Sequence, residues 1–80
     1  MTVTVLLFAS YADALGRPEI DLSLPAGATV ADAVRRVAAL PGGDRVPGSP
    51  LVAVNERYAL LDQRLAPGDE VAIIPPVAGG

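Results

Sequence analysis

The sequence predicts an α+β domain in which a mixed sheet of four or five strands carries one main helix across one face. Aliphatic and β-branched segments at residues 2–8 and 70–74 are typical of strands, and they stand at the two ends of the chain. One amphipathic helical pattern lies between them. With 80 residues, 51% of them hydrophobic, the chain is long enough for one compact core.

Residue type and alternation predict the strands. The segment 2–8 is nearly continuous in apolar residues, as in a central strand that is buried on both faces. Residues 20–24 alternate between apolar and polar, which predicts a strand with one buried face. Residues 51–54 and 70–74 predict two further strands. The last of these follows Ala66-Pro-Gly-Asp69, which has Pro and Gly at the two central positions of a type II turn.

The main helix is predicted to begin after Thr29. The Thr29 hydroxyl can accept a hydrogen bond from the first helical turn, and the charge of Asp32 suits the positive end of a helix. The apolar residues that follow recur with helical spacing and form one stripe: Val30, Ala33, Val34, Val37 and Ala38. The Pro-Gly-Gly segment at 41–43 is expected to end the helix.

The connections are predicted to be irregular. Residues 10–18 are expected to form the loop of a hairpin between the first two strands. Residues 41–50, rich in Gly and Pro, are expected to form a loop that packs no core. Residues 55–56 predict a turn, and residues 58–65 an irregular stretch with apolar anchors.

The two most apolar strands, the first and the last, are expected to lie side by side and parallel in the centre of the sheet. Together with the order β-β-α-β-β, this is the β-grasp (ubiquitin-like) arrangement, expected over residues 1–76. One helix covers only one face of such a sheet. We therefore expect the side chains on the other face, including Phe8, to form a partner surface, unless a loop such as 41–50 folds over them.

Missing residue types exclude several kinds of function. Without Cys or His the chain has no thiolate nucleophile, no Ser-His-Asp triad and no imidazole or thiolate metal ligand. The net charge of −3 and the lack of a basic cluster argue against nucleic acid and anionic membranes as partners. No apolar run approaches the roughly 20 residues of a membrane helix. We expect a cytoplasmic protein with no metal site, no stably bound cofactor and no catalytic activity of its own.

The predicted reactive element is the C-terminal segment Pro75, Pro76, Val77, Ala78, Gly79 and Gly80. The two prolines hold the backbone extended and cannot donate to a sheet ladder. The small residues 77–80 are predicted to form a flexible tail that can enter a narrow channel in another protein. The working group is then the α-carboxylate of Gly80. Because a carboxylate is a poor electrophile, it must first be adenylated, with ATP supplied by a partner enzyme.

Residues 65–80 resemble the ending of the small subunits of molybdopterin synthase, a family of ubiquitin-like sulfur carriers. The similarity extends to residues 5–9, 28–32 and 51–55, and it weakens in the loop 41–50 and in the segment after Ser10. The resemblance implies that an adenylating enzyme of the ubiquitin-activating type adenylates Gly80 and that a sulfur donor converts it to a thiocarboxylate. It also implies that the tail enters the large synthase subunit, which uses the sulfur to build molybdopterin.

Three alternatives stay open at this point. The first is a sulfur carrier for thiamine or cysteine biosynthesis, although carriers of the thiamine type usually lack the Pro-Pro exit. The second is a ubiquitin-like modifier conjugated to lysines; having no Lys, this chain could not build chains on itself. The third is an interaction module whose terminal glycines have no role.

Overall fold

The computed structural model describes residues 1–76, and the predicted tail at 77–80 lies outside the described residues. Seven helices and strands and one 3-10 turn follow one another as β1 (Thr2–Leu7), α1 (Ala9–Leu15), β2 (Glu19–Ser23), α2 (Val30–Ala38), η1 (Gly43–Arg45), β3 (Leu51–Val54), β4 (Arg57–Tyr58) and β5 (Glu70–Ile74). The strands form one five-stranded sheet in the order β2-β1-β5-β3-β4.

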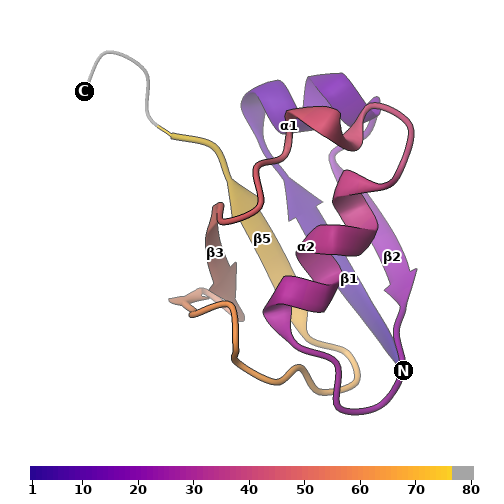
Figure 1. Ribbon diagram of the computed structural model, residues 1–80, viewed down its shortest axis with the longest axis vertical. Coiled ribbons are helices and arrows are strands. Elements are labelled where there is room, and N and C mark those ends of the chain that lie inside the picture. The colour runs from indigo at the N-terminus through magenta and orange to yellow at the C-terminus, as the bar shows by residue number, and fades with distance from the viewer. Residues whose placement is uncertain (77–80) are drawn as a thin grey trace.

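The centre of the sheet is the parallel pair β1 and β5, as the sequence predicted (Figure 1). In their register Val5 lies opposite Val71, and both side chains are fully buried. Strand β2 extends the sheet antiparallel to β1, and β3 extends it antiparallel to β5. Since β1 and β5 point the same way, the chain enters the sheet at one end and leaves it at the opposite end.

Helix α2 crosses one face of the sheet and closes the core on that side (Figure 1). The predicted stripe faces the sheet, with all of its members buried except Ala38, which is partly buried. The buried side chains of the strands that meet this helix are aliphatic, among them Val3, Val5, Leu7, Ile20, Leu22, Val52, Val54, Val71 and Ile73. Burial of this apolar surface is the main term that favours folding.

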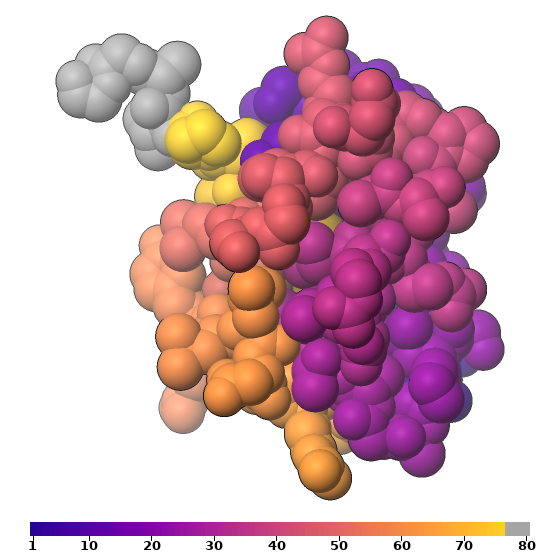
Figure 2. Space-filling model, viewed as in Figure 1, coloured from indigo at the N-terminus to yellow at the C-terminus, as the bar shows by residue number. Residues whose placement is uncertain are grey.

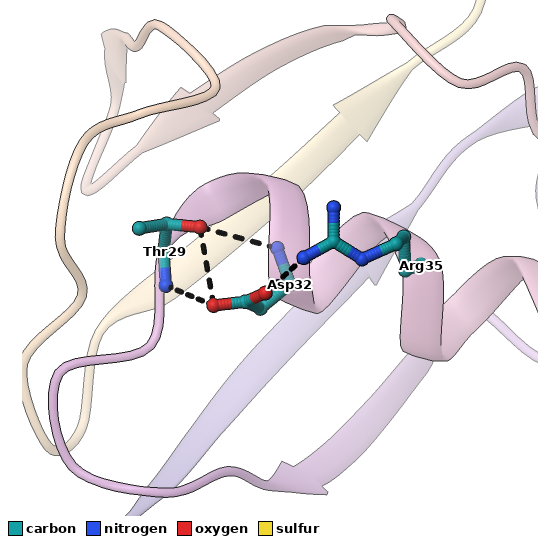
Figure 3. A network of polar contacts seen from close by, with 3 residues as sticks. All are labelled: Thr29, Asp32 and Arg35. Atoms are coloured by element: carbon teal, nitrogen blue, oxygen red, sulfur yellow. Dashed lines mark hydrogen bonds and ion pairs between the residues drawn. The ribbon is translucent and has the colours of Figure 1, made fainter.

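Thr29 and Asp32 form a complete capping box at the start of α2 (Figure 3). The Thr29 backbone N–H donates to the Asp32 carboxylate at 2.9 Å, and the Asp32 N–H donates to the Thr29 hydroxyl at 3.3 Å. Arg35, one turn later, donates to the other oxygen of the same carboxylate. The Thr29 N–H bond, with help from its hydroxyl and the Arg35 guanidinium, holds the pKa of Asp32 below its ordinary value of 3.8.

This lowered pKa predicts how stability depends on pH. Because the folded-state pKa of Asp32 lies below the unfolded value, its carboxylate stabilises the fold above pH 3.8, and the contribution is lost as the pH falls through the folded-state pKa. We expect Asp32→Asn to destabilise the protein at neutral pH and to become equal to wild type in strong acid. Chemical denaturation across this pH range measures the difference, with Asp13→Asn on α1 as the control for loss of one charge. A deficit that persists unchanged in acid contradicts the prediction.

The prediction of an irregular loop after Ser10 is wrong, because residues 9–15 form helix α1. Its helix signals are weak: Phe8, in the N-cap position, makes no side-chain cap bond, and no acidic residue stands in the first turn. Its C-cap is Gly16 in the left-handed conformation, with φ of 80°. Tertiary packing supports so short a helix, since Tyr11 is buried against the core.

The prediction that the loop 41–50 packs no core is also wrong. Val46 belongs to the core cluster, and Gly43 is buried in η1. At Gly42 and Gly43 the backbone runs so close to the helices that an added Cβ would overlap the carbonyl oxygens of Ala14 and Val37. The loop therefore packs on the helix side of the molecule, next to α1 and α2 (Figures 1 and 2).

Two predicted turns are confirmed, and Asn55 joins them. Asn55 and Glu56 both have positive φ, at 50° and 70°, as in the tight hairpin turn between β3 and β4. Gly68 has φ of 81°, as the third position of a type II turn requires. The Asn55 amide donates to the Asp69 carboxylate at 2.9 Å and accepts from the Glu70 N–H at 3.0 Å. These bonds hold the start of β5 against the end of β3.

Candidate functional site

The predicted reactive segment continues directly from β5, the strand that pairs on both sides in the middle of the sheet. Ile74 still pairs with Leu51, and the pairing ends there, before Pro75. Pro75 is half-buried and Pro76 is exposed. These two residues lead away from the end of β5 (Figure 1). The predicted site residues Val77, Ala78, Gly79 and Gly80 lie outside the described residues.

The sheet face opposite α2 carries a cluster of apolar side chains next to this exit. Alternation and register place one row of directly opposed residues across four strands of that face: Leu6, Ala72, Ala53 and Tyr58. Ile74 and Leu51 form the next row. Tyr58 is 74% exposed and Leu51 51% exposed, and no element of residues 1–76 covers this face. We call this set, together with Phe8, the open-face patch.

Phe8 joins the patch from the end of β1. Its backbone is still extended, with φ of −128° and ψ of 152°, so its side chain alternates with the buried Leu7 and points to the face opposite α2. It is 45% exposed. Ala9 then takes φ of 46°, a left-handed conformation that L-residues rarely adopt, and the chain turns at once into α1. The predicted exposure of Phe8 on the uncovered face is confirmed, and the loop 41–50 does not cover it.

Sequence reasoning named only Phe8 from this patch. Leu51, Ile74 and Tyr58 were missed, although alternation along residues 51–54 and 70–74 already divides those strands into two faces. What the sequence lacks is the register, which brings these side chains together from three strands. Tyr58 was assigned to an irregular stretch, whereas it lies in the two-residue strand β4.

The same face becomes acidic toward β2 and toward the start of β5. Asp21 and Glu70 flank Thr4 in one row, and Glu19 stands beside Leu6 in the next. All three carboxylates are exposed. Among residues 1–76 no group of three or more Asp, Glu, His or Cys side chains is arranged to hold a metal ion, and no helix is long and apolar enough to cross a membrane. The face thus suits a partner surface that is apolar at one end and basic at the other.

The chain is similar in sequence to known proteins along almost its whole length. The family model described as the ThiS family matches residues 5–80, almost the whole chain. The chain belongs to the ThiS family. Two relatives named molybdopterin synthase sulfur carrier subunit are similar along their length. The one from Chlamydomonas reinhardtii is 37% identical over all of both chains, and the one from Arabidopsis thaliana is 34% identical over 98% of this chain and 82% of its own.

A solved structure shows the fold of this ThiS family member independently. The crystal structure of SAMP1 from Haloferax volcanii matches with a TM-score of 0.84 and 32% identity over all of both chains. The predicted ubiquitin-like β-grasp fold is thereby confirmed, with five strands in the sheet and a second, short helix that the sequence did not reveal.

Proposed function

We propose that this ThiS family member is the sulfur-carrier subunit of a molybdopterin synthase and that the carboxylate of Gly80 carries the sulfur. The full-length similarity to sulfur carrier subunits of that enzyme is the observation that carries the proposal. The fold supports it, because β5, which pairs with a strand on each side, ends directly before Pro75, where the proposed carrier segment begins. Among residues 1–76 no cluster of His, Cys, Asp and Glu side chains offers a competing metal site.

The proposed chemistry takes place at the chain terminus. A carboxylate oxygen of Gly80 attacks the α-phosphorus of ATP in an adenylating enzyme of the ubiquitin-activating type, and pyrophosphate leaves. Hydrosulfide delivered by a sulfur donor then attacks the acyl carbon, the C–O bond to AMP breaks, AMP and a proton leave, and a thiocarboxylate remains. The chain itself binds no stable cofactor and no metal in this scheme. ATP belongs to the partner's site, and we place the reaction in the cytoplasm.

The tail then enters the large subunit of the synthase. Pro75 and Pro76 keep the backbone extended at the exit, while Val77, Ala78 and Gly79 present little side-chain bulk to a channel. The chain alone is no catalyst in this proposal: it positions a sulfur atom, and the large subunit supplies the catalytic groups. Intact-mass measurement after co-expression with an adenylating enzyme and a sulfur donor tests the carrier role. Replacement of one oxygen by sulfur, localised to Gly80, is the expected result.

The open-face patch is the proposed docking surface for the large subunit. We expect Leu51→Arg to weaken the complex by at least tenfold, because it places an unpaired charge in the middle of a desolvated apolar contact. The control is Asp44→Arg in η1, an exposed position on the helix side of the domain. Titration calorimetry with the large subunit measures both variants, and circular dichroism checks their fold. Equal losses for the two variants contradict this placement of the interface.

The similarity to two crystal structures from H. volcanii, of SAMP1 and of small archaeal modifier protein 1, favours a second candidate function: conjugation of Gly80 to amines of other proteins. Adenylation of the terminus is common to both functions. The mass experiment separates them, because a carrier exchanges one oxygen for sulfur and a modifier gains the mass of a target protein less one water.

A further inference from the structure

An activated C-terminus can react with nucleophilic groups of the protein that carries it. The acyl-adenylate of Gly80, which the proposed function requires, is an electrophile toward any nearby unprotonated amine or thiolate. Attack by an amine forms a C–N bond, breaks the C–O bond to AMP and releases a proton to water. The product is a stable amide that no longer carries sulfur. The nucleophiles on the chain's own surface therefore decide whether the activated form survives.

No side chain in the sequence of 80 residues supplies such a nucleophile. Lys, Cys and His are absent, and all six basic residues are Arg. A guanidinium stays protonated at any pH a protein meets, so it carries positive charge without nucleophilic character. Two of the arginines use their guanidinium groups in structural contacts. Arg35 forms an ion pair with Asp32, and Arg36 donates to the Ser23 carbonyl at 3.1 Å.

The α-amine of Met1 is the remaining amine of these residues, and the fold places it out of reach. It donates to the Leu24 carbonyl at 2.7 Å, at the end of the sheet where β1 begins. Because β1 and β5 are parallel, the tail leaves at the other end (Figure 1). In the register of β1 and β5, Leu7 lies opposite Ile73, so Phe8 is level with Ile74. Met1 is seven residues before Phe8, a separation of about 23 Å at the usual strand rise. Six residues from Pro75 to Gly80 span at most about 21 Å, and they would have to reverse direction.

We propose that the domain is inert toward its own activated terminus: adenylated Gly80 does not acylate the chain that carries it. This inference rests on the proposed function. The adenylate is then consumed by water, by a sulfur nucleophile or by an amine of another molecule. A second copy offers no lysine, so copies cannot be linked to one another through side-chain amines.

The test uses the full chain with its adenylating enzyme and ATP, without a sulfur donor, at mildly alkaline pH. Hydroxylamine is the probe for the adenylate, since it converts the terminus to a hydroxamate that intact-mass spectrometry detects. Without hydroxylamine we expect no cyclic self-adduct of wild type. The cyclic adduct has the mass of the chain, 8.1 kDa, less one water, which distinguishes it from a dimer of twice that mass less one water.

Two lysine variants provide a matched pair. Arg17 is exposed and directly precedes Pro18. The Pro18 carbonyl accepts a hydrogen bond from the N–H of Leu7, the last residue of β1, so Arg17→Lys places an amine near the end of the sheet where β1 and β5 finish. It lies about two strand spacings, roughly 10 Å, from β5, which is within reach of the tail. Arg64 forms an isolated backbone β-bridge with Thr29, the residue before α2. The start of α2 is at the opposite end of the sheet (Figure 1). We expect the cyclic product from Arg17→Lys, at least tenfold above that from Arg64→Lys.

The outcomes separate the two proposals. Failure of wild type to form the hydroxamate overturns the proposed function, and the inference with it. Hydroxamate formation together with a cyclic wild-type self-adduct leaves the proposed function standing and overturns the inference. If Arg17→Lys forms the hydroxamate but no cyclic product, lysine depletion is not what protects the chain, and the inference is again overturned.

Discussion

Deleting Gly80 is expected to abolish thiocarboxylate formation while leaving the free energy of unfolding unchanged. The core cluster of the described residues ends at Ile73, and Gly80 has no side chain to bury, so we expect its loss to leave the core intact. Function, in contrast, needs a carboxylate at one distance from the end of β5. A single residue changes that distance by up to about 3.5 Å, and a misplacement of about 1 Å can cost 100-fold in rate.

An extension by one residue beyond Gly80 should have the same effect, because it moves the carboxylate outward by the same amount. Gly80→Ala should be milder, since it keeps the distance and adds only a Cβ. Mass spectrometry of the thiocarboxylate gives the rates for the three variants and wild type, and chemical denaturation gives their stabilities. Sulfuration of the shortened or extended chain at the wild-type rate would falsify the terminal-carboxylate mechanism.

Gly43→Ala is expected to be the most destabilising of the conservative single substitutions considered. A Cβ at this position overlaps the Val37 carbonyl oxygen and lies 2.8 Å from that of Ala38, so the backbone of η1 or the end of α2 must move. Overpacking of this kind costs on the order of 3 kcal/mol. In a domain of this size such a loss lowers the melting temperature by on the order of 10 °C or more.

Gly42→Ala should behave in the same way for two reasons, because φ there is 86° and the Cβ would overlap the Ala14 carbonyl. Gly48→Ala is the matched control: the same methyl group, in the same loop, meets nothing within 4 Å. Thermal unfolding followed by circular dichroism compares the three. If Gly48→Ala is as destabilising as Gly43→Ala, then general stiffening of the loop, and not close approach to the helices, explains the effect.

The element pattern of this protein could be predicted from the sequence because it depends on local physics. The alternation in residues 20–24, the Thr29 cap and the type II turn before Glu70 each act within a few residues, and each is confirmed. The parallel centre of the sheet joins distant segments, but it could also be predicted, because the two most apolar strands have to be buried together. The absence of Cys, His and Lys, and the Gly-Gly ending, are also properties of the sequence alone.

Tertiary structure decided what depends on distant partners. Helix α1 has too few local signals to be predicted, and burial of Tyr11 holds it in place. The loop 41–50 looks unstructured in sequence, yet Gly42 and Gly43 allow it to approach two helices more closely than any other residue could. The open-face patch exists only because register brings Leu51, Ile74 and Tyr58 beside Phe8. Such contacts join residues far apart in the chain, and a pattern confined to neighbouring residues carries no information about them.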